Sequence, residues 1–270
     1  HWRALLPKIE VCPQVFVRHG DYRHEMESLS LAGKLLLYQG HLNAAQARFT
    51  RCHERGLQLP AGAYRAFGPF GLAEVGLCLG TIPLAELERV ADLGSDWITQ
   101  MENMDNAYSL RRLGLLVRLA WLAGDAPRAR ETVMAGVAAA ARFERCGFWA
   151  HEGYAGIGEG LLQLRRHELE AGGSLPPLDR AWATYRKALE GHVRRFPPAS
   201  AMRDRLLGQA MLERGHVATS RKHLERAIRC AESRGMRVEL ARCCDAMAPL
   251  QSAANWNDRA RSVWAEVRRG

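Results

Sequence analysis

Helical periodicity runs through almost the whole chain and constrains its fold more than any other feature. Apolar residues recur at positions i, i+3, i+4 and i+7, whereas alternation of apolar and polar residues rarely lasts beyond three or four positions. The periodic stretches are rich in alanine, leucine, arginine and glutamate, which are good helix formers. Prolines stand mostly between these stretches, as at Pro60, Pro176 and Pro197. We therefore predict an all-α fold.

A glycine ends four of these stretches and predicts where two antiparallel helices are joined. The four are Gly40, Gly80, Gly124 and Gly215. Glycine adopts the left-handed backbone conformation that stops one helix and lets the chain fold back. A small residue follows each glycine five positions later: Ala45, Ala85, Ala129 and Ser220. Four positions further stand Phe49, Arg89, Val133 and Leu224, of which only Arg89 is not apolar.

These offsets resemble the tetratricopeptide repeat, a helix–turn–helix unit of about 34 residues. The match is good around Gly33 and Gly40, and again from Leu207 to Ala227. The resemblance implies an α-α superhelix, a solenoid of antiparallel helix pairs. In each pair the small residue lets two helices approach and the larger one fills the gap beside it. An irregular helical bundle is the alternative fold.

The chain is predicted to form a single solenoid domain over residues 1–270, with a kink or linker at 170–178. The glycine- and proline-rich run from Glu170 to Pro177 marks this linker, and we expect the next helix to start near Asp179. A second break lies around Pro197 and Pro198. Ser200 is expected to be the N-cap of the helix that follows.

Several stretches resemble the C-terminal helical-repeat region of large bacterial signalling proteins that carry a class III nucleotide cyclase domain and a STAND (AAA-type) ATPase. They are Gly147 to Gly156, Arg195 to Pro198, Glu232 to Met236, Trp2 to Pro7, and His19 to Asp21. The resemblance implies a regulatory or interaction module, with nucleotide chemistry in other domains. The chain begins with His1 rather than methionine, so we expect a processed chain or an excised segment.

The charge balance is basic, with a formal net charge of +9, and residues 201–270 carry the larger share of it. Only four of the 38 basic residues are lysine, which indicates a GC-rich bacterial genome. A basic stripe near the C-terminus comprises Arg221, Lys222, Arg226, Arg229, Arg234, Arg237 and Arg242. Glu225, Glu232 and Glu239 interleave with it and neutralise its field. Sequence-specific nucleic-acid binding is therefore not expected, and weak salt-sensitive adsorption is favoured.

Composition also excludes a membrane span and a disulfide framework. Arg118 interrupts the most apolar stretch, Leu113 to Leu122, which is too short to cross a bilayer. The first residues do not form a basic-then-apolar leader. The seven cysteines include no CxxC pair and favour thiols in a reducing, cytoplasmic compartment.

Motifs for chemistry are weak. A phosphate loop at Gly33-Lys34 lacks its first glycine and its hydroxyl residue. The cluster of Gly153, Gly156, Gly158 and Gly160 does not fit the dinucleotide-binding pattern, and close helix packing explains it better. The histidine and cysteine groups, such as Cys52-His53 and Cys243-Cys244, lack zinc-site spacing. We predict no catalytic residue, no metal and no cofactor.

A concave groove is the candidate functional surface, because the first helices of successive pairs line one face of such a solenoid. Aligning the repeats on their turn glycines places ten residues there: Glu27, Lys34, Tyr38, Arg111, Arg118, Trp121, Glu152, Glu159, Arg205 and Gln209. Mixed charges with two aromatic rings suit a peptide or helix. For Trp121 a place in the core is equally compatible with its apolar surroundings.

Two classes of function are compatible with this surface. The favoured one is a non-enzymatic interaction or regulatory module that binds another protein or the remaining domains of its own chain. The alternative is a small-molecule sensor of the STAND type, whose groove would close on a metabolite. A sensor predicts an enclosed pocket with converging polar groups, and a scaffold predicts an open groove or a large apolar patch.

Overall fold

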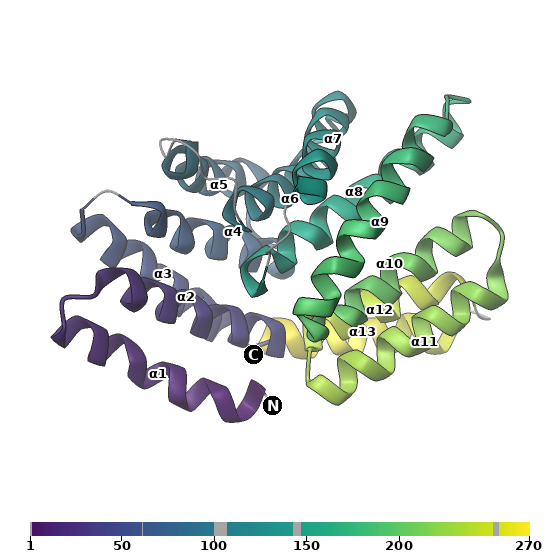
Figure 1. The fold of residues 1–270 in the computed structure, drawn as a ribbon. Helices are drawn as coiled ribbons and strands as arrows, with labels where there is room; N and C mark the ends of the chain where they lie inside the picture. The colour runs from purple at the N-terminus through teal and green to yellow at the C-terminus, as the bar shows by residue number, and fades with distance from the viewer. Residues whose placement is uncertain (1, 61, 100–106, 143–146, 251–253) are drawn as a thin grey trace. The chain divides into compact units, whose positions relative to one another are not determined.

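The computed structural model describes residues 2–60, 62–99, 107–142, 147–250 and 254–270, and it confirms the all-α prediction (Figure 1). The described residues contain 13 α-helices and four short 3-10 helices, and no strand. The α-helices pack in sequence as adjacent pairs, consistent with an α-α repeat array. No helix in these ranges combines the length and the apolar character that a membrane span requires.

Two compact units make up the chain. Unit 1 comprises His1–Glu102, Ala231–Asp245 and Ala253–Gly270, and unit 2 comprises Asn103–Cys230 and Ala246–Ser252. Unit 1 contains α1 (Trp2–Arg18), α2 (Tyr22–Gln39), α3 (Leu42–Gln58), α4 (Phe67–Leu79), α5 (Leu84–Thr99), most of α12 (Arg237–Met247) and α13 (Ala254–Arg269). Unit 2 contains α6 (Ala107–Leu122), α7 (Ala126–Arg142), α8 (His151–Glu170), α9 (Pro176–Arg195), α10 (Ser200–Glu213) and most of α11 (Val217–Arg234).

The four predicted turn glycines are confirmed. Gly40, Gly80, Gly124 and Gly215 have φ angles of +84°, +69°, +71° and +78°, in the left-handed region. Each ends a helix at the junction where the sequence pattern placed it. A residue with a side chain would be strained in this conformation, so glycine stops each helix at low cost.

The predicted packing inside the hairpins is confirmed in two of them. A Cβ atom placed on Gly33 of α2 would lie 2.8 Å from the ring of Phe49 on α3. A Cβ atom on Gly208 of α10 would lie 2.7 Å from Leu224 on α11. In both hairpins a large side chain fills the space that the glycine leaves open. The small residues Ala45 and Ser220 are fully buried beside them.

The hairpin of α4 and α5 departs from the predicted register. Ala85 and Arg89 are exposed, and Leu87 and Ala91 are buried instead. The reason is the longer link after Gly80, since α5 begins only at Leu84. The helix therefore presents a different face to its neighbour than the spacing from the glycine predicts.

The two predicted breaks between helices are present, with differences at their edges. α8 ends at Glu170 and α9 begins at Pro176 rather than near Asp179, because proline is tolerated in the first turn of a helix. Ser200 does not cap α10, so that prediction is wrong. The Ser200 hydroxyl donates a 2.7 Å hydrogen bond to the carbonyl oxygen of Pro197, at the end of a short 3-10 turn.

Unit 1 joins helices from both ends of the sequence. Val267 of α13 lies against the turn between α2 and α3, where a Cβ atom placed on Gly40 would lie 2.9 Å from Cγ2 of Val267. Arg268 of α13 donates a 3.4 Å hydrogen bond to the carbonyl oxygen of Cys78 at the end of α4. In a linear repeat array each repeat contacts only its neighbours. Unit 1 differs, because its last helix packs on its first hairpins.

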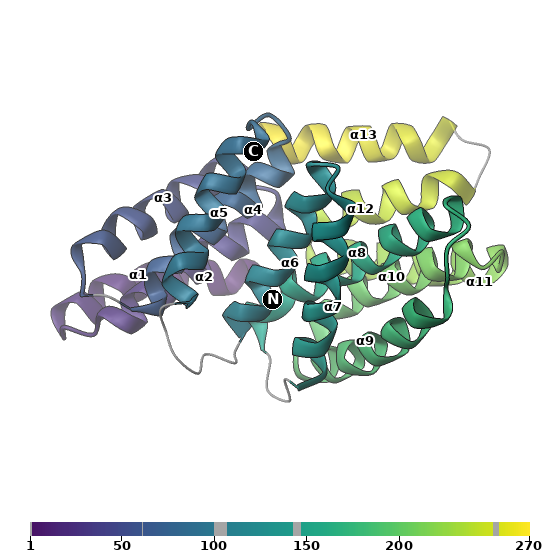
Figure 2. The same ribbon diagram turned by 90° about the horizontal axis from the view of Figure 1, so that it is seen from above.

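The core of unit 2 is rich in aromatic rings. Tyr154 on α8 and Tyr185 and Trp182 on α9 are buried within it, with the Trp182 and Tyr185 rings 5.7 Å apart. His192 on α9 stacks on Tyr154 at 4.5 Å between ring centroids and is itself buried. These rings bury large apolar areas and fix how α8 and α9 pack together. Figure 2 shows α8 and α9 from a second direction.

Candidate functional site

The backbones of α6 and α8 lie very close together, and glycines make this approach possible. A Cβ atom on Gly156 of α8 would lie 2.2 Å from the carbonyl oxygen of Gly114 on α6. A Cβ atom on Gly114 would in turn lie 2.5 Å from the carbonyl oxygen of Gly153. The close helix packing that the glycine cluster at 153–160 predicts is thereby confirmed. The approach brings α6 side chains within reach of α8.

Arg118 of α6 binds two glutamates on α8. Its Nη1 donates a 2.7 Å hydrogen bond to Oε2 of Glu152, and its Nε donates a 2.9 Å bond to Oε2 of Glu159. The two glutamates stand seven residues apart, a spacing that places them on one face of the helix. The side chains of Arg118 and Glu152 are only 12% and 6% exposed.

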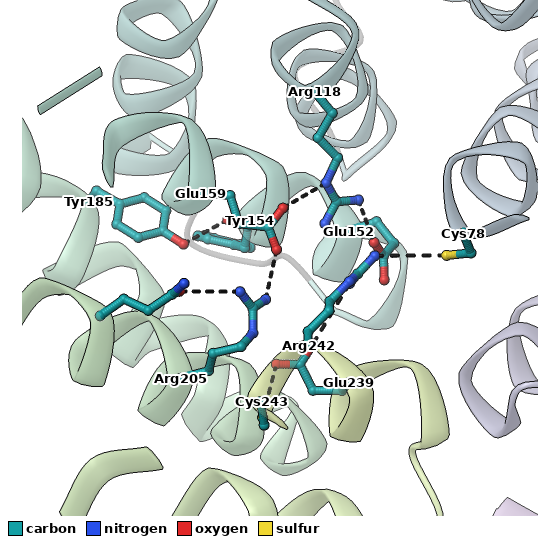
Figure 3. Close-up of polar contacts among 11 residues, drawn as sticks. Cys78, Arg118, Glu152, Tyr154, Glu159, Tyr185, Arg205, Glu239, Arg242 and Cys243 are labelled. Atoms are coloured by element: carbon teal, nitrogen blue, oxygen red, sulfur yellow. Dashed lines mark hydrogen bonds and ion pairs between the residues drawn. The ribbon is translucent and has the colours of Figure 1, made fainter. Parts of the chain in front are cut away.

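Arg205 of α10 extends this contact to a third helix. Its Nη2 donates a 2.7 Å hydrogen bond to Oε1 of Glu159, and its Nη1 donates a 3.4 Å bond to Oε1 of Gln209. One carboxylate, that of Glu159, therefore joins α6 and α10 through its two oxygens (Figure 3). We call this set the charged strip: Arg118, Glu152, Glu159, Arg205 and Gln209.

The charged strip balances its own charges, because it holds two arginines and two glutamates. Arg205 is nearly fully buried, whereas the side chain of Glu159 is 22% exposed. Removing one partner of such a buried ion pair would leave the other charge buried and unpaired, which strongly destabilises the fold. The strip therefore ties three helices together and presents mainly Glu159 and Gln209 to solvent.

Tyr185 of α9 lies beside the charged strip. Its hydroxyl donates a 2.7 Å hydrogen bond to the carbonyl oxygen of Tyr154 on α8. Burial raises the pKa of Tyr185 well above its ordinary value, and the negative charge of Glu159 raises it further. The phenol therefore remains protonated at neutral pH and acts as a hydrogen-bond donor within the fold (Figure 3).

The two arginines hold the carboxylates of the charged strip in fixed positions. Guanidinium groups keep their charge at all ordinary pH values and donate hydrogen bonds in a fixed geometry. The described ranges contain no group of three or more histidine, cysteine, aspartate or glutamate side chains that could hold a metal ion. The solvent edge of the strip consists of the Glu159 carboxylate and the Gln209 amide, and Arg118 and Arg205 are more deeply buried behind them.

The structure brings together five of the ten predicted groove residues, and these are the members of the charged strip. The two other candidates in unit 2, Arg111 and Trp121, also belong to α6. Arg111 is fully buried. Trp121 is half-buried against the core of unit 2, with its ring 6.1 Å from that of His167 in an edge-on contact. Of the two interpretations of Trp121, its packing favours the core.

The remaining three candidates, Glu27, Lys34 and Tyr38, lie on α2 in unit 1. Glu27 is half-buried and accepts a 3.1 Å hydrogen bond from Arg23, one turn earlier. Lys34 and Tyr38 are buried. Of these three, only Glu27 presents part of its side chain at the surface.

Unit 1 holds a second polar cluster, of which the sequence predicted only the pairing of Arg242 with Glu239. Arg242 of α12 lies 3.7 Å from Glu239 and 4.0 Å from the sulfur of Cys78 on α4. The thiol of Cys243 lies 3.9 Å from the buried carboxylate of Glu239 (Figure 3). Glu239 stands three and four residues before Arg242 and Cys243, a spacing typical of neighbours on one helix turn, and this spacing could also have indicated the contact of Cys243. No local pattern relates Cys78 to α12.

The basic stripe is neutralised partly by acids distant in sequence. Arg226 lies 3.6 Å from Asp204 on α10, and Arg237 forms an ion pair with Glu266 on α13. Arg242 pairs with Glu239, as the interleaved spacing predicts. These contacts reduce the positive field that a nucleic-acid phosphate would meet along α11 and α12.

No protein-family model matches this chain, and no curated protein sequence matches it. The fold itself is an all-helical array of packed antiparallel helices.

Proposed function

We propose that this chain is a non-enzymatic repeat module that binds another protein and regulates it. We further propose that it is a segment of a larger bacterial signalling protein with a nucleotide cyclase or a STAND-type ATPase domain. The observation that carries the proposal is the bridge made by Glu159, which joins Arg118 of α6 to Arg205 of α10. Alternate helices of successive hairpins thus contribute to one polar surface.

Helix-hairpin arrays act through the shape and charge of their surfaces, because each hairpin adds side chains to a shared face. The strip offers mixed charges held in fixed positions, which favours orientation and specificity in protein recognition. The grooves formed by α9 to α11 and by α12 and α13 are both open to solvent. Open grooves support a scaffold more than a sensor that encloses a small molecule.

The larger-protein part of the proposal is supported by the resemblance of Gly147 to Gly156 and Glu232 to Met236 to the helical-repeat region of bacterial cyclase and STAND proteins. Its partner would then be another protein or the remaining domains of the same chain. Determining the full open reading frame tests this part. An upstream cyclase or ATPase domain would support it, and an open reading frame without either would contradict it.

The binding part is tested with the purified chain as bait in cross-linking and mass spectrometry, followed by titration with each purified candidate partner. The variant Gln209→Lys changes the solvent edge of the charged strip. The matched control Gln163→Lys makes the same change at an exposed position of α8 outside the strip. We expect the strip variant to weaken binding by about fivefold or more and the control to leave it unchanged.

Two outcomes would contradict the proposal. The first is binding that is equally affected, or equally unaffected, by the two glutamine variants, because the strip would then have no special role. The second is a rise in melting temperature on addition of a nucleotide or metabolite, without any protein partner. That result would favour the small-molecule sensor.

A further inference from the structure

Unit 2 carries an open groove on the side of α10 opposite to the charged strip. The groove has a volume of about 710 Å³ and is lined by residues of α9, α10 and α11. Its α10 residues are Leu207 and Met211, which alternate with Arg205 and Gln209 of the strip. Two residues turn a helix by about 200°, so the two pairs face opposite ways. In Figure 1, α10 lies between α9 and α11.

The floor of this groove is apolar. Leu207 and Met211 are half-buried and follow one another at i, i+4 on α10, and Ala183 of α9 adds a small exposed surface beside them. Methionine is flexible and polarizable, so it adapts to differently shaped apolar groups. The floor is therefore suited to apolar side chains of a partner.

The α9 rim of the groove is positively charged. Arg186, Lys187 and Arg194 line it and are exposed, and no acidic group lies within ion-pair distance of them in the described part of the chain. Glu190, the acidic residue on the same rim, forms an ion pair with Arg203, with 3.3 Å between Oε2 of Glu190 and Nη1 of Arg203. The rim therefore has an excess of positive charge that is available to a partner.

The walls of the groove are helices, and this limits the form of its occupant. Backbone N–H and C=O groups within α9, α10 and α11 are used in their own helices, so an extended peptide would find few backbone partners there. A helix satisfies its own backbone and can lay one apolar face on such a floor. The lining from Ala183 to Arg194 spans about 17 Å along α9, which is about three helical turns.

We propose that this groove binds an acidic amphipathic helix of a partner protein. The apolar face of the partner helix lies on Leu207 and Met211, and the carboxylates of the partner helix lie along Arg186, Lys187 and Arg194. This inference rests on the proposed function, since it specifies the kind of protein segment that the module binds. A nucleic acid fits less well, because the floor offers aliphatic side chains where bases need aromatic rings to stack on.

A labelled synthetic peptide tests the proposal by fluorescence anisotropy with the full chain. The peptide is a helix of about 18 residues with leucine at every third or fourth position and glutamate over most of the remainder. Three comparison ligands accompany it. They are a scrambled peptide of the same composition, a version with lysine in place of glutamate, and a single-stranded oligonucleotide of equal charge. We expect the acidic amphipathic peptide to bind at least fivefold more tightly than each of them.

Matched variants then locate the binding. Arg194→Glu and Arg195→Glu make the same charge change at adjacent exposed residues of the last turn of α9, and only Arg194 lines the groove. Met211→Gln and Met134→Gln make the same polar change, and Met134 is an exposed residue of α7 outside the groove. We expect Arg194→Glu and Met211→Gln to weaken peptide binding by about fivefold or more. The two controls should bind as the wild type does.

Three results would overturn the inference. They are equal weakening by Arg194→Glu and Arg195→Glu, tighter binding of the oligonucleotide, and failure of the acidic peptide to bind at all. The proposed function is tested separately by the Gln209→Lys variant, its Gln163→Lys control and the cross-linked partners. A partner that still binds the Arg194→Glu chain as it binds the wild type would leave the proposed function intact and remove the groove from it. Circular dichroism confirms that each variant is folded.

Discussion

The carbonyl oxygen of Gly114 on α6 lies 2.2 Å from the point where a Cβ atom on Gly156 of α8 would stand. This is a backbone contact, so no side chain can rotate away to relieve it. We predict that Gly156→Ala forces α6 and α8 apart and lowers the free energy of unfolding by about 3 kcal/mol. Urea denaturation followed by circular dichroism measures the change.

The control for this prediction is Gly191→Ala. Gly191 also lies within a helix of unit 2, and a Cβ atom there would meet only the end of the Arg195 side chain at 3.7 Å. Alanine has the higher helix propensity, so this variant should be more stable than the wild type by about 0.5 to 1 kcal/mol. Two variants of equal stability would contradict the close backbone contact.

A second prediction concerns Gly40, which combines a positive φ angle with close contact to Val267 and Arg237. Gly124 has a similar φ angle but nothing within 4 Å of its Cβ position. Gly124→Ala should therefore cost only the backbone strain, about 1 to 2 kcal/mol, whereas Gly40→Ala should cost about 2 to 4 kcal/mol. Thermal unfolding of both variants makes the comparison. Equal losses would mean that α13 does not cover the α2–α3 turn.

The third prediction is a pH dependence caused by Glu213 on α10. Burial raises the pKa of Glu213 to about 7, although Arg166 and Arg165 act in the opposite direction from 3.1 and 3.8 Å. Between pH 4.5 and 7 the folded chain thus holds a proton that the unfolded chain releases. The contribution of Glu213 to stability should therefore fall as the pH rises through this window and stay constant above it.

The variant Glu213→Gln cannot ionise and supplies the reference for this titration. The wild type should lose roughly 1 to 3 kcal/mol relative to the variant between pH 4.5 and pH 8. Urea denaturation at several pH values measures the difference. A difference between the two proteins that is independent of pH would show that Glu213 ionises normally in the fold.

The fourth prediction concerns the reactivity of thiols. Burial raises the pKa of Cys244 in α12 to about 11, and its side chain is fully buried. Cys12 in α1 is partly exposed. Because the thiolate is the reactive form, iodoacetamide at pH 8 should label Cys12 well before Cys244. Mass spectrometry of the labelled peptides measures both rates. In urea the two should react alike, and similar rates in the native protein would contradict the buried position of Cys244.

The parts of the fold that sequence predicts are those that depend on neighbours along the chain. Gly40 and Gly33 sit at fixed distances from Ala45 and Phe49, so one short pattern specifies both the turn and the packing of a hairpin. The sequence pattern already fails at Arg89, and its prediction that Ala85 packs between α4 and α5 is wrong because the longer link after Gly80 shifts the start of α5. The prediction that Ser200 caps α10 is wrong, because a 3-10 turn at Pro197–Ala199 leads directly into the helix and Ser200 is already its first residue.

The candidate site was predictable where its residues follow the helical spacing or occupy equivalent positions in successive hairpins. Glu152 and Glu159 share a helix face by their spacing, and the alignment of hairpins placed Arg118 and Arg205 on the same surface. The contact of Arg242 with Cys78 was not predictable, because 164 residues separate the two and no periodic pattern connects them. The contact of Val267 with Gly40 was not predictable either, because these two residues are also far apart in the sequence and no periodic pattern connects them.

The contact of α13 with the α2–α3 turn has a consequence for the order in which the chain can fold during synthesis. Most of unit 2 is encoded by one uninterrupted stretch, Asn103–Cys230, whereas unit 1 also needs Ala231–Asp245 and Ala253–Gly270. Domains generally fold as their residues leave the ribosome. The hairpin of α2 and α3 therefore remains without α13, with Gly40 uncovered, until α13 has been synthesised, so unit 1 begins before unit 2 and is completed after it.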